Sequence, residues 1–377
     1  MLFSLPPAES YIPLSAIVRA LLRGRDDFEQ DLQSFLGVKN CGLFSSGKAS
    51  LYRLLVALKL KDRAGRNQVL IPGYTCYSVA ASVVKAGLEI RCYDLDPHTF
   101  CPDEKSVRTW AGKNTLAIIG QHLFGIPTPL DGLKGIAEST GSCVIEDAAQ
   151  ALGGSHQGIP LGALGDFGIL SFGRGKPLPL GCGGAITAKD GKTLQDLEMR
   201  EVKNGYASFA RAALTQVVSK PYLYWVAETL PLGLGETIFD PGFQVQSMPG
   251  AIRKLGKIVF EEMDKLNAHR REIAAIYTEA IGEMKSPPVP SESAPVYTRY
   301  PVLAGINPIP RSLYRLGVRR MYPNAILEAP AIKPHCFQEP GWTKGASEIS
   351  RKLITLPTHR AISKQVALEV AKEAGKN

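Results

Sequence analysis

The 377-residue sequence has no low-complexity tract, and no stretch reaches the ~18 uncharged apolar residues of a membrane-spanning helix. Its first ten residues lack a basic segment followed by a long apolar one, so we expect no signal peptide. The seven cysteines are odd in number and form no C-x-x-C pair, and several lie in apolar runs that are typical of reduced, buried thiols. The expected location is therefore the cytoplasm.

The sequence also lacks a basic helix or a ladder of basic and aromatic residues, so nucleic acid is not an expected partner. Its 44 basic and 35 acidic residues give a formal charge of +9, and the basic residues are scattered. A mildly cationic surface explains this charge, and a polyanionic ligand or an anionic membrane surface is the functional alternative. With 45% hydrophobic and 21% charged residues, the composition is that of a globular protein.

The order of apolar patterns indicates the fold class. Short apolar runs predict strands at 41–44, 69–72, 89–93, 116–120 and 143–145, and helical spacing predicts helices over 13–36, 49–60, 77–86 and 132–140. This alternation predicts an α/β fold with a mostly parallel sheet covered by helices. We expect a large domain over 1–240 and a smaller α+β domain over 241–377, which begins with one long charged helix over 251–283.

Residues 206–235 form a distinct segment within the expected large domain. They are apolar and aromatic, but charged residues and two prolines, Pro221 and Pro231, interrupt them. One interpretation is a pair of amphipathic helices that covers the core or a dimer surface. The other is a segment that contacts a membrane surface or a partner protein.

One lysine and one acid are candidates for catalysis. Lys176 follows the run from Ser171 to Gly175 and precedes a glycine cluster at 181–184, and a surface-loop lysine is the alternative interpretation. Asp147 ends an apolar run, where a carboxylate is costly unless it is paired, although it can also cap a helix. A lysine that forms an imine and a carboxylate that pairs with a pyridine nitrogen are what pyridoxal phosphate (PLP) needs from a protein.

A turn that can bind phosphate precedes both candidates. Ser45-Ser46-Gly47-Lys48 lies between a predicted strand and a predicted helix. Backbone N–H groups at a helix N-terminus bind phosphate, and Gly47 permits close approach. Such turns are common, so this signal is weak alone. The order of the turn, Asp147 and Lys176 along one α/β domain strengthens it.

Together these motifs resemble the DegT/StrS family of PLP-dependent sugar aminotransferases, which have the aspartate-aminotransferase fold (fold type I). The similarity covers nearly the whole chain. Residues 146–153 resemble the family's E-D-A-A-Q-A-x-G, residues 46–51 its S/N-G-T-x-A-L, and residues 171–176 its S-F-x-x-x-K. Shorter matches lie at 71–75, 93–97, 122–125, 165–168, 181–184 and 356–359.

The resemblance implies a role for each matching residue. Lys176 would carry the cofactor as a Schiff base and shuttle a proton, and Asp147 would pair with the pyridinium nitrogen. Gln150 would support the side of the ring that carries the phenolic oxygen. The phosphate would be held by Gly47, Lys48 and Ser171.

The chain departs from the family's pattern around this cofactor. Cys76 stands where an aromatic residue usually stacks on the ring, so either Tyr77 replaces that residue or the stacking contact is lost. Lys48 replaces the threonine of the phosphate turn, and Cys182 replaces the glutamate of G-E-G-G. The N-x-R element, which the family donates to a neighbouring subunit's site, reads Gln244 and Gln246.

The resemblance implies a PLP-dependent aminotransferase of surface-polysaccharide or amino-sugar biosynthesis. It would move an amino group from glutamate to a nucleotide-linked keto-sugar, as a homodimer with its site at the interface. One alternative is a sugar dehydratase on the same fold, but such enzymes carry histidine in place of Lys176. The other is a non-catalytic regulator or scaffold of a polysaccharide pathway, which the altered cofactor surroundings favour.

Overall fold

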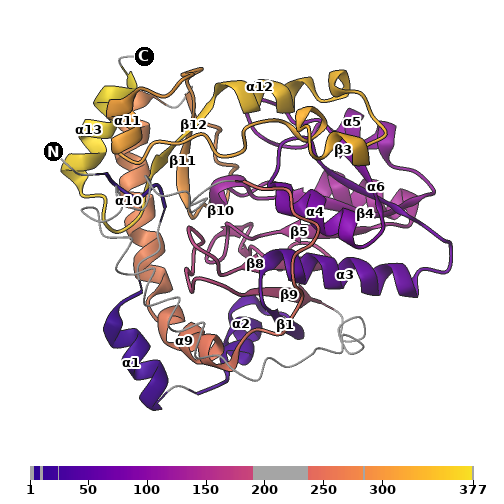
Figure 1. Cartoon of the computed structure of the whole chain (residues 1–377), viewed down its shortest axis with the longest axis horizontal. Coiled ribbons are helices and arrows are strands. Elements are labelled where there is room, and N and C mark those ends of the chain that lie inside the picture. The colour runs from indigo at the N-terminus through magenta and orange to yellow at the C-terminus, as the bar shows by residue number, and fades with distance from the viewer. Residues whose placement is uncertain (1–3, 9–11, 24, 190–236, 283–284, 376–377) are drawn as a thin grey trace.

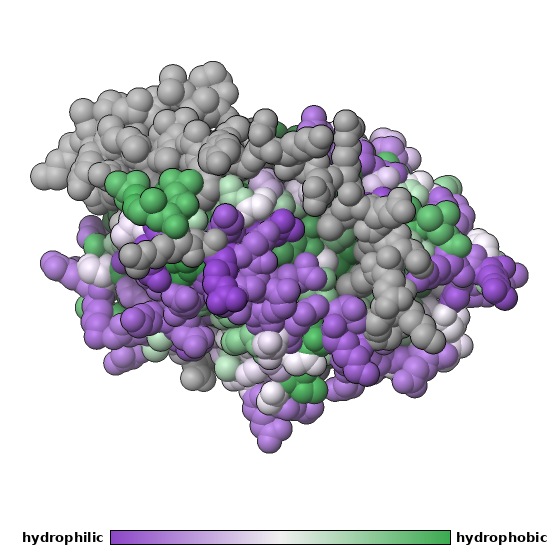
Figure 2. All heavy atoms as spheres, turned by 90° about the horizontal axis from the view of Figure 1, so that it is seen from below, coloured by the Kyte–Doolittle hydropathy of each residue, from purple (hydrophilic) through white to green (hydrophobic). Residues whose placement is uncertain are grey.

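The computed structural model describes residues 4–8, 12–23, 25–189, 237–282 and 285–375 (Figure 1). The segment 206–235, for which we expect amphipathic helices, lies outside these residues. In the described part of the chain, no helix is long and apolar enough to cross a membrane. The face seen in Figure 2 is mostly hydrophilic, with hydrophobic side chains in separate patches.

A seven-stranded sheet forms the centre of the molecule, in the order β1-β9-β8-β5-β4-β2-β3. Strands β3, β2, β4, β5 and β8 run parallel, while β9 is antiparallel to both β8 and β1. The predicted α/β fold with a mostly parallel sheet is therefore confirmed. The strand bounds are β1 Asn40–Phe44, β2 Gln68–Pro72, β3 Glu89–Tyr93, β4 Thr115–Gln121, β5 Cys143–Asp147, β8 Phe167–Ser171 and β9 Gly184–Ala188.

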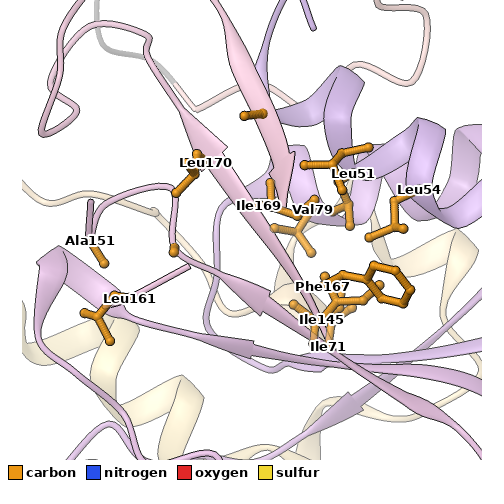
Figure 3. Packing of buried hydrophobic residues seen from close by; sticks show 14 of the residues in the cluster. Leu51, Leu54, Ile71, Val79, Ile145, Ala151, Leu161, Phe167, Ile169 and Leu170 are labelled. Carbon is orange, nitrogen blue, oxygen red and sulfur yellow. The ribbon is translucent and has the colours of Figure 1, made fainter. Parts of the chain in front are cut away.

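Helices that follow the strands bury the sheet. Helices α3 (Gly47–Lys61) and α4 (Tyr77–Lys85) pack together, as do α5 (Glu104–Trp110) and α6 (Asp131–Thr140). Every residue of β4 is buried, as expected for a central parallel strand. Burying each large apolar side chain contributes about 1.5–3 kcal/mol. Figure 3 shows the apolar side chains of α3 and α4 gathered over the sheet, with labels on Leu51, Leu54, Val79, Ile71, Ile145, Phe167 and Ile169.

Two expected long helices are each broken in two. The segment 13–36 forms α1 (Leu14–Arg23) and α2 (Phe28–Leu36), and the segment 251–283 forms α9 (Gly250–Phe260) and α10 (Met263–Ile281). Helix α9 packs on α1 and α2, whereas α10 packs on the C-terminal helix (Figure 1). Asp26, in the first break, pairs with Arg253 of α9 at 2.7 Å. Aspartate favours helix ends over helix interiors, which agrees with a break at this position.

The chain after residue 285 contributes to two hydrophobic clusters. Strands β11 (Arg299–Leu303) and β12 (Leu353–Pro357) pair antiparallel, and with α10, α11 (Arg311–Arg315) and α13 (Lys364–Gly375) they enclose the smaller cluster. Residues 322–332 and α12 (Lys344–Lys352) pack instead into the main core. The boundary at 240/241 stays a prediction. The short elements are β6 Ser155–His156, β7 Ile159–Pro160, β10 Ser293–Ala294, η1 Leu123–Gly125, η3 Ile326–Glu328, η4 Lys333–His335 and η5 Pro340–Trp342.

Candidate active site

A cavity of about 250 Å³ lies at the carboxyl ends of the parallel strands. Its walls include the last residues of β4, β5 and β8 and the first residues of α3. This edge is where open α/β sheets bind ligands. Most predicted site residues line the cavity, namely Gly47, Lys48, Cys76, Asp147, Gln150, Ser171 and Lys176. The fold thus brings them together, while their individual roles stay predictions.

The turn before α3 forms one end of the cavity. Ser46 caps the helix by accepting a hydrogen bond from the Ala49 N–H at 3.2 Å. The first N–H groups of a helix have no partner within it, so those of Gly47 and Lys48 are suited to an anion. A side chain on Gly47 would bring its Cβ within 2.9 Å of the Ser171 Cβ. Glycine therefore lets the helix end and the end of β8 lie against each other.

The glycine cluster after Lys176 supports this turn from behind. Gly183 donates its N–H to the Ser45 carbonyl at 2.9 Å. A Cβ on Gly184 would lie only 2.4 Å from the backbone of the turn. Cys182, between Gly181 and Gly183, does not line the cavity.

Asp147 ends β5 and faces the cavity. Burial raises the pKa of its carboxyl group, and the Lys176 ammonium and the Ala149 N–H oppose this rise. Oδ1 accepts the Ala149 N–H at 3.1 Å. Among the described residues, no hydrogen-bond donor reaches Oδ2. A half-buried carboxylate that has only part of its hydrogen bonding satisfied is suited to a cationic N–H group of a ligand.

Beside Asp147, a buried pair of side chains orients the floor of the cavity. Glu146 is fully buried and accepts the N–H groups of Gly162, Leu164 and Gly165 at 2.6–3.1 Å. Its Oε1 also lies 2.9 Å from His122 Nε2. The Thr128 N–H donates to His122 Nδ1, so the ring proton is on Nε2 and points at Glu146.

Lys176 lies on a loop that is fixed at several points. Its N–H donates to the Gly173 carbonyl at 3.3 Å, and Leu178 and Leu180 on the same loop are fully buried. Arg270 of α10 donates to the Lys176 carbonyl. These contacts explain how a lysine in a sequence rich in glycine and proline has a defined position. The surface-loop interpretation of Lys176 does not apply, because its side chain lines the cavity.

Gln150 is held by three side-chain contacts. Its Oε1 accepts from the Phe124 N–H and the Thr298 hydroxyl, and its Nε2 donates to the Tyr322 hydroxyl at 3.1 Å. Tyr322 lines the cavity and packs on Tyr74 with the ring centroids 5.3 Å apart. Sequence reasoning missed Tyr322, because it lies far along the chain with no motif around it. It also assigned no role to His122, although this residue begins a recognised family motif.

Cys76 lines the cavity at the start of α4, and Tyr77 does not. The Ser78 hydroxyl donates to Cys76 Sγ at 3.0 Å. The Tyr77 hydroxyl instead exchanges hydrogen bonds with the backbone of Asn324 at 3.1–3.2 Å. These bonds direct the Tyr77 side chain toward the C-terminal half, which favours loss of the ring-stacking contact over its replacement by Tyr77.

The segment 240–246 runs beside the phosphate turn. Lys48 Nζ lies 3.7 Å from Asp240 Oδ2 and 4.7 Å from the centroid of the Phe243 ring. Gln244 and Gln246 are exposed, and the backbone of Gln246 bonds to Ser45. Lys48 thus lines the cavity, and its ammonium group forms an ion pair with the Asp240 carboxylate.

The residues present fit pyridoxal phosphate. Its phosphate would be held by the Gly47 and Lys48 N–H groups and the Ser171 hydroxyl. A Cβ on Gly47 would fill the space between the turn and Ser171. The cofactor's aldehyde requires an amine, which Lys176 would supply. Its ring nitrogen requires a carboxylate, which Asp147 would supply.

Comparison with known proteins identifies relatives of this chain. Over 185 residues it is 30% identical to the L-glutamine:2-deoxy-scyllo-inosose aminotransferase of Streptoalloteichus tenebrarius, covering 49% of this chain and 43% of that protein. Over 164 residues it is 32% identical to the GDP-perosamine synthase of Caulobacter vibrioides, covering 44% and 43%. These matches span less than half the length of either relative.

The fold is also that of solved aminotransferase structures. The PLP form of the sugar aminotransferase Spr1654 of Streptococcus pneumoniae, whose assignment is itself provisional, superposes with a TM-score of 0.75 at 18% identity, covering 99% of this chain and 100% of that one. The model of the DegT/DnrJ/EryC1/StrS aminotransferase family matches residues 22–374. The chain belongs to the DegT/DnrJ/EryC1/StrS aminotransferase family, as its motifs predict.

Proposed function

We propose that this protein is a PLP-dependent sugar aminotransferase that moves an amino group from glutamate to a nucleotide-linked keto-sugar. One observation carries the proposal: Lys176, Asp147 and the N-terminus of α3 line a single cavity. When bound, PLP joins a lysine amine through its aldehyde, and its protonated ring stabilises negative charge at the substrate carbon.

The residues of the cavity divide the work between binding and proton transfer. Lys176 Nζ takes the proton from the α-carbon of the amino donor, which it can do only as a neutral amine. Asp147 would hold a proton on the ring nitrogen. The fixed amide of Gln150 would support the side of the ring that carries the phenolic oxygen, and the turn at Gly47 would hold the phosphate.

The names of the relatives support the class of acceptor. One relative is named for transfer from L-glutamine to 2-deoxy-scyllo-inosose, and the other for the synthesis of GDP-perosamine. The second name agrees with a nucleotide-linked acceptor, whereas the first names glutamine as the donor, which the panel of donors below distinguishes from glutamate. The nucleotide diphosphate is the part of our proposal that agrees with the +9 charge of the chain.

We also propose a homodimer whose interface passes close to the cavity. The exposed Gln244 and Gln246 lie beside the phosphate turn, at the positions of the family's element that reaches a neighbouring subunit. The segment 206–235 remains a candidate for contact with a membrane surface or a partner protein.

Purified protein supplied with PLP provides the test. We expect a visible absorbance band that borohydride removes, and mass spectrometry should find the reduced cofactor on Lys176. Lys176→Ala should abolish both signals, while Lys59→Ala should change neither, because Lys59 bonds to carbonyls at the surface. Absence of the band in the wild type would overturn the proposal.

The substrate is tested by a panel of acceptors and donors. Keto-sugars linked to GDP, UDP and dTDP are offered with glutamate or glutamine, next to a free cyclitol ketone. Transfer to a nucleotide-linked sugar supports the proposal, and transfer only to the cyclitol contradicts the substrate class. Cofactor binding without transfer to any acceptor would favour the regulator or scaffold alternative.

A further inference from the structure

Two polar side chains on one turn of α10 are buried where a helix usually buries apolar ones. Asn267 is 1% exposed and Arg270 is 2% exposed. Residues three apart lie on the same face of a helix, and here their neighbours on that face are Met263, Ile273 and Ala274. Neither Asn267 nor Arg270 lines the cavity. Burying an amide and a guanidinium is unfavourable unless each is hydrogen-bonded, so their partners indicate what they do.

Their partners are the loop that carries Lys176 and the turn that follows Asp147. Arg270 Nη1 donates to the Pro177 carbonyl at 3.0 Å, and Nη2 donates to the Lys176 carbonyl at 3.3 Å. Asn267 Nδ2 donates to the Leu152 carbonyl at 3.1 Å. Leu152 belongs to the turn that follows Asp147 at the end of β5.

A hydrogen bond within α10 joins these two sets of contacts. Arg270 Nη1 donates to Asn267 Oδ1 at 2.7 Å. The result is one continuous series of bonds from the loop after Asp147, through two side chains, to the backbone of Lys176. Gly153 makes room for it, because a Cβ there would lie 2.3 Å from Asn267 Nδ2.

We infer that Arg270 and Asn267 are positioning residues that fix Lys176 relative to Asp147. The inference rests on the proposed function, since it takes those two residues as the catalytic pair. Lys176 sits on a loop rather than on a strand, so its backbone depends on contacts from outside the loop. The planar guanidinium donates to the two carbonyls from separate nitrogens held in a rigid fork, a geometry that the single nitrogen of an ammonium group does not reproduce.

Displacement of a catalytic group by about 1 Å can lower the rate about 100-fold. We therefore expect Arg270→Lys to lower kcat about 10- to 100-fold, with little change in the KM of the keto-sugar. The visible absorbance of the lysine-linked cofactor should also titrate at a different pH, because the distance between Lys176 and Asp147 has changed. A residue that only stabilises the fold would leave this titration where it is.

Arg299→Lys is the matched control. Arg299 is 3% exposed and likewise donates to backbone carbonyls, those of Gly317 and Thr355, in the smaller cluster. We expect it to lower thermal stability without moving the titration midpoint or kcat. Asn267→Ser is the second variant, which keeps the Arg270 contacts to the Lys176 loop and breaks the link to Leu152. Asn267→Ser should shift the titration midpoint in the same direction as Arg270→Lys, by a smaller amount. If Arg270→Lys does not fold, the titration and kcat of Asn267→Ser test the inference.

The outcomes separate this inference from the proposed function. A wild-type protein without the visible band refutes the proposed function and the inference with it. A wild type with the band, and variants at 267 and 270 with unchanged titration and kcat, refutes the inference alone. Equal shifts in the Arg299 control would also overturn it, since the effect would then be general loosening of the fold.

Discussion

Replacement of Glu146 by glutamine tests the floor of the cavity directly. Glu146 Oε1 receives the Gly162 N–H and His122 Nε2, and Oε2 receives the N–H groups of Leu164 and Gly165. Glutamine has one oxygen and one amide nitrogen. Whichever way its amide is turned, two buried donors lose their acceptor and meet an N–H group.

Each buried donor left without an acceptor costs about 1–3 kcal/mol. His122 cannot relieve the conflict by moving its proton, because its Nδ1 already accepts from the Thr128 N–H. We therefore expect Glu146→Gln to lower the free energy of unfolding by about 2–6 kcal/mol, a large share of the ~5–15 kcal/mol of a typical domain.

Urea unfolding, followed by circular dichroism, measures this loss. The matched control is Glu348→Gln, which removes a surface pair with Lys352 at 2.7 Å on α12. Exposed pairs of this kind contribute about 0–1 kcal/mol. A Glu146→Gln protein as stable as the control would refute the reasoning, because the four contacts would then contribute little to the fold.

Three further substitutions test the cavity itself. Asp147→Asn should lower kcat about 100- to 1,000-fold. Because burial raises the folded-state pKa of Asp147, wild-type protein without cofactor should also gain stability as the pH falls through that pKa. Melting curves from pH 3.5 to 7 should not show this gain in the variant. Cys76→Phe should bind PLP about 2- to 10-fold more tightly in a fluorescence titration if a ring there stacks on the cofactor, whereas Tyr77→Phe should leave this affinity unchanged. Gly47→Ala should cost about 1–3 kcal/mol by overpacking against the end of β8 and should weaken PLP binding, while Gly112→Ala, where the new methyl group meets open space, should do neither.

Local patterns predicted most strands of the sheet, because β2, β4 and β5 are largely buried and read as short apolar runs, but they did not predict β8. They did not predict the breaks within 13–36 and 251–283. The apolar spacing continues across both breaks, and the ion pair made at the first, between Asp26 and Arg253, joins residues 227 positions apart in the sequence. The spacing of apolar residues along the sequence carries no information about such a long-range contact.

Some residues of the candidate site were also predictable from local motifs, and others were not. Gly47, Asp147 and Lys176 were predictable because each lies in a local motif at a strand end, where chemistry and backbone geometry coincide. Tyr322 and Arg270 come from segments where nothing local marks them. Arg270 lies in the run His269-Arg270-Arg271-Glu272, which reads as a solvent-exposed helix face, and only the packed structure shows that one of these charges is buried.

The departures from the family's pattern also acquire a spatial meaning. Lys48 contacts Asp240 and Phe243, and Gln246 bonds to the turn at Ser45, so these changes adjoin one another at the phosphate end of the cavity. Lys176 and Asp147, the proposed catalytic pair, match the family's pattern. If they act as proposed, the two clustered departures alter recognition at one edge of the cavity, where substitutions should affect cofactor or substrate affinity more than kcat.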